Sequence, residues 1–156
     1  MVRYLYLLRH GHAEHGHQID DFDRELTGTG VANLLTLSAK LKAAEFAPDL
    51  IFCSSARRTQ QTAEVVTNHI GYQKPVEYLD EIYEASVKQL FEVIATADVN
   101  NEHVMLIGHN PSISFLSDYL AKEDILDLAP GQLAKIAFVD QDWSEITKGS
   151  GTYQEI

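Results

Sequence analysis

The feature that most constrains the fold of this chain is an apolar run near its N-terminus that ends in reactive polar residues. Residues 3–8 are largely apolar and aromatic, without alternation, and they lead directly into Arg9-His10-Gly11. Runs of this kind are typical of a central strand that is buried on both faces. Open α/β sheets bind ligands outside the carboxyl ends of their strands. We therefore expect Arg9 and His10 to lie at a ligand-binding end of a sheet.

The rest of the chain alternates between strand and helix patterns. Apolar runs predict further strands at residues 49–53, 74–78, 103–108 and 133–139, and a closing strand near 143–146. Helical spacing of apolar residues predicts helices that begin near Thr27, Arg57, Ser86 and Pro111. This alternation predicts a three-layer α/β/α sandwich, with a mostly parallel central sheet and helices on both faces. At 156 residues, without a linker or repeat, the chain is expected to form one domain over residues 1–156.

The net charge narrows the classes of partner. The chain carries 23 acidic and 12 basic residues, a formal net charge of -11, whereas a nucleic-acid-binding face must be basic. Any anion site must therefore be a local concentration of cations in a negative field. The sequence has no run near the roughly 18 apolar residues of a membrane helix and no signal-peptide pattern. Its single cysteine, Cys53, fits a reducing compartment. We expect a cytoplasmic protein with no nucleic-acid or membrane partner.

Polar side chains follow three of the predicted strands at the point where each strand ends. These segments are Arg9-His10-Gly11, residues 54–58 (SSARR) and Gly108-His109-Asn110. If the strands are parallel, their ends share one end of the sheet, and two imidazoles lie beside at least two guanidinium groups. Guanidinium groups match phosphate oxygens in bidentate geometry, and a neutral imidazole can act as a nucleophile. The pattern predicts a phosphate pocket that contains a candidate covalent nucleophile.

The same segments resemble the signatures of a known family. Arg9-His10-Gly11, residues 58–63 (RTQQTA) and residues 108–111 (GHNP), in this order, resemble the three motifs of the histidine phosphatase superfamily, which has the phosphoglycerate-mutase-like fold. The short length, residues 23–30 (DRELTGTG) and residues 83–86 (YEAS) are similar to its SixA-type branch of phosphohistidine phosphatases. The resemblance covers nearly the whole chain, and it implies a metal-independent phosphatase without a cofactor.

The resemblance also implies roles for the motif residues. His10 would be the nucleophile that forms a phosphohistidine intermediate, while Arg9, Arg58 and His109 would bind the phosphoryl oxygens. Arg58 rather than Arg57 has the family's spacing from the segment that follows, which leaves Arg57 on the outer rim.

The general acid is less narrowly indicated. Family members that act on small phosphoesters often use a glutamate in a Leu-x-Glu context, and Leu79-Asp80-Glu81 has this pattern. Glu81 is the candidate, Asp80 and Glu84 are nearby substitutes, and a solvated loop carboxylate is the competing interpretation. A phosphoramidate needs less acid catalysis than a phosphoester, because imidazole can leave already protonated.

The favoured substrate is phosphohistidine on a protein. The segment between the helix that begins at Arg57 and the strand near Tyr78 is short, whereas larger relatives insert lid segments here that enclose small substrates. A compact chain predicts a shallow, open pocket that suits a protein-borne phosphoryl group. A phosphatase for small phosphoesters is the alternative. A phosphoglycerate-mutase-type phosphotransferase is disfavoured, because re-transfer of the phosphoryl group favours an enclosed site.

The remaining motifs allow other interpretations. His12, His15 and His17 could bind a metal, but without cysteine or helical spacing a solvated rim loop is favoured. Cys53 does not have the Cys-x5-Arg spacing of a thiol phosphatase, and residues 27–30 (TGTG) suit a helix cap better than a dinucleotide loop. A non-enzymatic phosphate-binding module and a metal-dependent hydrolase are the rival functional classes.

Overall fold

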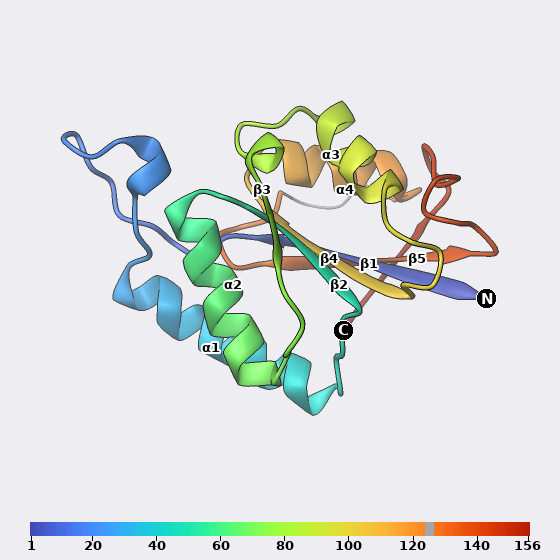
Figure 1. Cartoon of the computed structure of the whole chain (residues 1–156), viewed down its shortest axis with the longest axis horizontal. Coiled ribbons are helices and arrows are strands. Elements are labelled where there is room, and N and C mark those ends of the chain that lie inside the picture. The colour runs from blue at the N-terminus through green and yellow to red at the C-terminus, as the bar shows by residue number, and fades with distance from the viewer. Residues whose placement is uncertain (124–126) are drawn as a thin grey trace.

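The computed structural model describes residues 1–123 and 127–156, and its centre is a six-stranded sheet (Figure 1). The strands are β1 (Val2–Arg9), β2 (Leu50–Ser54), β3 (Glu77–Leu79), β4 (His103–Gly108), β5 (Leu133–Val139) and β6 (Thr152–Gln154), in the order β3-β2-β4-β1-β5-β6. The first four strands are parallel, whereas β5 runs antiparallel to both β1 and β6. The carboxyl ends of β1, β2 and β4 therefore lie side by side at one end of the sheet.

Helices cover both faces of this sheet. Among the described residues, α1 (Gly28–Ala43) and α2 (Arg57–Ile70) pack on one face, and α3 (Val87–Ala95) and α4 (Ser112–Leu120) pack on the other (Figure 1). Two short 3-10 segments, η1 (Asp21–Asp23) and η2 (Asp80–Ile82), lie in the connections. The predicted three-layer α/β/α architecture and its mostly parallel sheet are confirmed.

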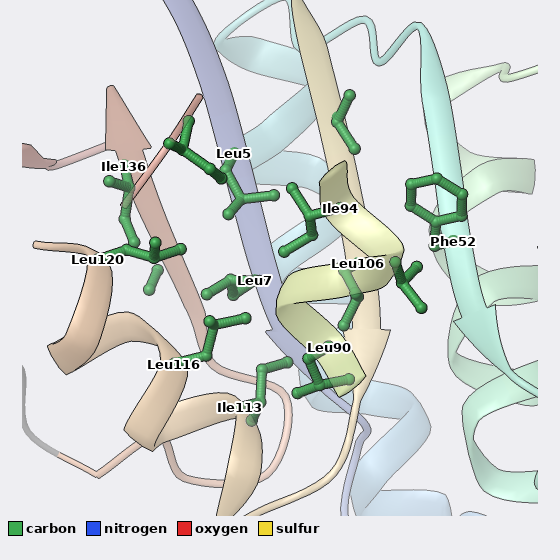
Figure 2. Packing of buried hydrophobic residues seen from close by; sticks show 14 of the residues in the cluster. Leu5, Leu7, Phe52, Leu90, Ile94, Leu106, Ile113, Leu116, Leu120 and Ile136 are labelled. Carbon is green, nitrogen blue, oxygen red and sulfur yellow. The ribbon is translucent and has the colours of Figure 1, made fainter. Parts of the chain in front are cut away.

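The side chains of β1 show why its apolar run does not alternate. Leu5 and Leu7 lie in the core cluster that contains residues of α3 and α4, and Figure 2 shows them beside Ile94 and Leu116. Tyr6 and Leu8 lie in the opposite cluster with residues of α1 and α2. Each buried Leu contributes about 1.5–3 kcal/mol relative to exposure. Burial on both faces fixes β1 in the middle of the molecule, so that its end places Arg9 and His10.

The loop between β1 and α1 packs directly on the start of that helix. A Cβ atom on Gly30 would lie 2.2 Å from the carbonyl oxygen of His12, so only glycine permits this approach. Thr27 caps α1 by accepting a hydrogen bond from the Gly30 amide at 3.0 Å, and the Thr27 amide donates to the His12 carbonyl oxygen at 3.0 Å. These contacts anchor both ends of the loop, and η1 in its middle contacts α2.

The sequence placed the closing strand wrongly. Residues 143–145 form a turn, and the closing strand, which pairs with β5 at the edge of the sheet, is β6. Trp143 and Ile146 are buried nevertheless, since the turn directs both into the core, where the indole N–H donates to the Asn101 carbonyl oxygen at 2.7 Å. Burial of apolar side chains therefore did not require an extended backbone here.

A smaller difference concerns the end of one element. The third strand begins at Glu77 rather than residue 74. Ser86 caps α3 as expected, in a capping box with Gln89. No helix in residues 1–123 and 127–156 is long and apolar enough to cross a membrane.

Candidate active site

A cavity of about 330 Å³ opens where the parallel strands end. Its lining residues are Arg9, His10, Asp21, Arg24, Arg58, Tyr83, Glu84, His109 and Asn110. Arg9 is the last residue of β1, Arg58 lies in the first turn of α2, and His109 directly follows β4. The structure thus brings together the four residues that the sequence predicted to meet around a phosphoryl group.

His10 is oriented for attack through one of its two ring nitrogens. Its Nδ1 lies 2.7 Å from the carbonyl oxygen of Gly11, which can only accept, so Nδ1 carries the proton. Nε2 then keeps its lone pair, and Arg58 Nε donates to it at 3.3 Å. Burial, followed by the nearby arginines, lowers the pKa of His10 to about 4. At neutral pH the ring is therefore uncharged, and its unprotonated Nε2, which accepts from Arg58, is the nucleophilic nitrogen.

Arg58 is the most constrained cation of the site. The side chain is buried, and its Nη1 donates to the backbone oxygen of Asp21 at 2.6 Å. Its Nη2 donates to the Asp21 carboxylate at 3.1 Å and lies 3.3 Å from Nδ1 of His109. With Nε on His10, the fork of the guanidinium spans both imidazoles. A lysine could not make these contacts, because its ammonium group is a single point of charge.

His109 takes the opposite tautomer to His10. A guanidinium has no acceptor, so Nδ1 of His109 must accept from Arg58. Its Nε2 lies 2.8 Å from the buried Ser54 hydroxyl and therefore donates to that oxygen. Burial, followed by His10 and Arg58, lowers the pKa of His109 to about 3. The two rings lie 5.2 Å apart between centroids, and both are neutral at pH 7.

Arg9 retains donor capacity for a ligand. Its Nη1 donates to the Leu128 carbonyl oxygen at 2.9 Å, as does the Asn110 side-chain amide at 2.9 Å. Its Nε is buried without a hydrogen-bond partner among the described residues. Burial lowers the pKa of Arg9 from its ordinary value, so the site gains from an anion that compensates the charge.

A second set of residues completes the cavity from the loops, and the sequence assigned none of them a role. The Asp21 carboxylate accepts from Tyr83 Oη at 2.6 Å, from Arg24 Nη1 at 2.8 Å and from Arg58 Nη2 at 3.1 Å. These bonds, that of Tyr83 foremost, keep the pKa of Asp21 far below its ordinary value. Burial and the bond to Asp21 raise the pKa of Tyr83 to about 12. Arg24 and Tyr83 lie in the segments, residues 23–30 and 83–86, that resemble the SixA-type branch, whereas the sequence signal for Asp21 is its i, i+3 spacing to Arg24.

The candidate general acid does not line this cavity. Glu81 lies in η2 and is exposed, whereas Glu84, one of the two substitutes considered, is among the lining residues. Glu84 has a positive φ of 54°, which turns the chain at the cavity rim. Arg57 is exposed and does not line the cavity, and its Nε lies 3.5 Å from Glu25.

The alternative sites take no part in the cavity. His12 lies 2.9 Å from the Thr27 hydroxyl, and His15 and His17 line a separate hollow of about 240 Å³ that shares Asp21 and Arg24 with the main cavity. The described residues contain no group of three or more metal-ligating side chains. Cys53 is buried, and burial raises the pKa of its thiol.

Comparison with known proteins agrees with this geometry. The profile of the histidine phosphatase superfamily (branch 1) matches residues 5–104, so the chain belongs to that superfamily. An uncharacterized protein of Mycobacterium tuberculosis, Rv1276c, is 30% identical over 122 residues, which are 78% of this chain and 75% of that protein.

Solved structures refine the assignment within the superfamily. A candidate phosphohistidine phosphatase SixA from Nakamurella multipartitia superposes with a TM-score of 0.83 at 25% identity, covering 99% of this chain and 95% of that one. A candidate SixA from Agrobacterium tumefaciens gives 0.81 at 29% identity, covering 87% and 92%. A mycobacterial glucosyl-3-phosphoglycerate phosphatase shares the fold at a TM-score of 0.70 and 17% identity, covering 99% and 98%. The chain is thus a phosphatase of the SixA-type branch with the phosphoglycerate-mutase-like fold.

Proposed function

We propose that this phosphatase removes the phosphoryl group from phosphohistidine on a protein, through a phosphohistidine intermediate on His10 and without a metal ion. The observation that carries the proposal is the neutral, buried His10. Its proton is fixed on Nδ1 by Gly11, and its Nε2 faces the guanidinium of Arg58. A nucleophile in this state needs no base to activate it.

In the first step Nε2 of His10 attacks phosphorus, and the bond from phosphorus to the leaving group breaks. Arg9 and Arg58 bind the equatorial oxygens, where phosphoryl transfer concentrates negative charge. His109 stays neutral, with Nε2 donating to Ser54 and Nδ1 accepting from Arg58, so Arg9 and Arg58 are the donors to the phosphoryl oxygens. Each such donor contributes about 10²–10³-fold in rate.

In the second step water attacks the phosphoryl group on His10. The electron pair of the broken P–N bond returns to Nε2, and the protons of the water remain with the released phosphate. His10 is thereby restored with its proton on Nδ1, still donated to Gly11. The cationic side chains Arg9 and Arg58 supply the positive charge that metal ions supply in other phosphoryl-transfer sites.

The protonation states in the cavity favour a nitrogen leaving group over an oxygen leaving group. An alkoxide needs an acid near neutral pKa to protonate it. Among the described lining residues, the two histidines are neutral and Asp21 is a carboxylate, and Tyr83 has its pKa raised to about 12. A phosphohistidine ring that is already protonated leaves as neutral imidazole. Phosphatase activity on small phosphoesters, with Glu84 or Glu81 as acid, is the second candidate.

The decisive experiment compares substrates on the purified protein. We expect a phosphohistidine-bearing protein to be hydrolysed with a much higher kcat/KM than a panel of small phosphoesters, in the presence and absence of a chelator. Rapid quenching in alkali should trap a labelled phosphoenzyme that is acid-labile, as phosphohistidine is. A strong preference for small esters would overturn the proposed substrate, and activity that disappears with the chelator and returns with zinc would overturn the metal-independent mechanism.

A further inference from the structure

Transfer from a substrate phosphohistidine to His10 exchanges one imidazole for another at phosphorus. The incoming ring has its distal N–H donated to the carbonyl oxygen of Gly11 at 2.7 Å. As the P–N bond forms, positive charge develops on this ring, and the bond to Gly11 strengthens. The outgoing ring starts in the same charged state and runs through the same change in reverse. A site that stabilises both rings in the transition state therefore requires an acceptor for the distal N–H of the leaving imidazole as well.

The transfer step balances without an added reactant. A substrate ring protonated on its distal nitrogen carries a phosphoryl dianion, with a net charge of one minus. Nε2 of His10 donates its lone pair to phosphorus, and the electrons of the breaking P–N bond go to the leaving nitrogen. The products are a neutral substrate histidine that keeps its distal proton and a phospho-His10 with a net charge of one minus.

We infer that the Asp21 carboxylate accepts the distal N–H of the leaving imidazole and thereby makes the site selective for phosphoimidazoles over phosphoesters. This inference rests on the proposed function. Asp21 lines the cavity beside His10 and is joined to it through a single side chain, since Arg58 donates from Nε to His10 and from Nη2 to Asp21. Its side chain keeps 49% exposure, so it lies at the mouth, where a protein-borne histidine enters.

The carboxylate is fixed in place and still has accepting capacity. An ionised carboxylate has about four lone-pair sites, and three are used by Tyr83, Arg24 and Arg58. Glu84 also lines the cavity, but no hydrogen bond or ion pair with the described residues fixes its side chain, so it would lose more rotamer entropy on binding. Asp21 is thus the better-organised acceptor of the two.

The surroundings of Asp21 also suit a flat ring. Tyr83 lies edge-on to Phe22 at 5.0 Å and to His109 at 5.6 Å between ring centroids. Phe22 is 38% exposed and adjoins Asp21 in η1. An imidazole that donates to Asp21 would lie against this aromatic wall. A sugar or glycerate leaving group would find neither the planar contact nor a proton donor of suitable pKa.

The test is a change of selectivity in D21N, measured with phosphoimidazole and p-nitrophenyl phosphate. The second substrate has no distal N–H and leaves as a stable anion. We expect D21N to lower kcat/KM for phosphoimidazole about 10- to 100-fold more than kcat/KM for p-nitrophenyl phosphate, the range for a hydrogen bond to a charged group. D23N is the matched control, because it removes the same charge two residues away outside the cavity lining. It should change neither value.

A pH profile adds a readout that a purely structural role would not change. A carboxylate raises the pKa of the imidazole that donates to it, so the alkaline limb for phosphoimidazole should move to lower pH in D21N. The groups that face Asp21 are Arg24, Arg58 and Tyr83. The ionisable groups Arg9, His10, Glu84 and His109 share the cavity, and His15 and His17 share the neighbouring hollow. D21E, which keeps the charge, should restore part of the selectivity even if D21N folds poorly.

Two results would overturn the inference. An equal loss on both substrates in D21N would mean that Asp21 only positions Arg58. An equal gain on both would mean that the carboxylate competes with phosphate for the cations. A wild-type protein that hydrolyses esters but not phosphoimidazole would instead defeat the proposed function, which is a separate outcome.

Discussion

The cavity has two walls that are built in different ways. His10, Arg58 and His109 form what we call the strand-end wall, and Asp21, Arg24 and Tyr83 form the loop wall. The side chain of Arg58 is 7% exposed, whereas that of its partner Asp21 is 49% exposed. The first wall originates at the ends of β1, β2 and β4, while the second comes from connections. One salt bridge thus joins a buried group to a solvated one.

The difference in burial indicates that the two walls contribute to function in different ways. Electrostatic interactions are stronger where water is excluded, so the strand-end wall is suited to stabilising charge on the phosphoryl group. Hydrogen bonds at the exposed wall are screened and contribute less, but they are accessible to a large partner. We therefore expect substitutions in the strand-end wall to reduce turnover of every substrate, and substitutions in the loop wall to alter the choice among substrates.

H10A tests the strand-end wall most severely. Removal of the nucleophile should lower kcat by at least about 10⁴-fold on both phosphohistidine and phosphoester substrates, and the alkali-stable phosphoenzyme should disappear. Orthovanadate binding, measured by calorimetry, would verify that the pocket still forms. Turnover that survives in H10A with a trapped phosphoenzyme elsewhere would break the assignment.

R58K should cost about 10²–10³-fold in kcat/KM on all substrates. The charge is kept, but a lysine cannot contact His10, Asp21 and His109 at once, as the guanidinium does. R57K is the matched control, since Arg57 is exposed and pairs only at 3.5 Å with Glu25. Comparable losses of kcat/KM in R57K and R58K would show that the burial of Arg58 and its contacts to both imidazoles do not contribute to catalysis.

S54A should have an effect of about tenfold, the range for one buried hydrogen bond. The Ser54 hydroxyl oxygen accepts a hydrogen bond from Nε2–H of His109 and so favours the tautomer whose Nδ1 accepts from Arg58. Without the hydroxyl, the buried Nε2–H of His109 loses its acceptor, and the acidic limb of the pH–rate profile should shift. S54T, which keeps a hydroxyl, should retain the profile. An unchanged profile in S54A would remove Ser54 from the positioning of His109.

The sequence predicted the strand-end wall well, for a physical reason. Arg9, His10, Arg58 and His109 adjoin long apolar strands or begin a helix, and such elements are encoded by local patterns. Once parallel strands are predicted, their ends must meet. The burial of β1 on both faces then fixes where Arg9 and His10 lie.

The loop wall was largely missed, because nothing local encodes it. Asp21 reaches Arg58 and Tyr83 across 37 and 62 positions of sequence, and residues 11–27 have no hydrophobic period that reports their path. Glu81 was favoured over Glu84 because Leu79-Asp80-Glu81 has the Leu-x-Glu pattern, which does not report where either side chain lies. A three-residue turn, η2, decides which of the two carboxylates faces the cavity. The closing strand was placed at 143–146 for a related reason, since a turn buried Trp143 as fully as a strand would.

The smallest expected effect is a dependence of folding stability on pH. It distinguishes the two walls because their groups titrate in different pH ranges. The pKa of His10 falls from 6.5 to about 4 and that of His109 from 6.5 to about 3 in the folded protein. Between pH 6.5 and about 4, the unfolded chain therefore binds more protons than the folded protein, and stability falls as the pH is lowered through this window. Asp21 has its pKa lowered from 3.8, so its stabilising contribution is lost only below this window.

Thermal unfolding from pH 7 to pH 4.5 should thus show a decrease of Tm, at roughly 2–4 °C for each kcal/mol lost. H10N replaces the ring with a neutral group that does not titrate, so its Tm should fall less over the same range, whereas D21N should follow the wild type. An identical fall in H10N would mean that water solvates the His10 ring as freely as it solvates Asp21. The strand-end wall would then lack the desolvation that distinguishes it from the loop wall, and the argument for its electrostatic role would fail with it.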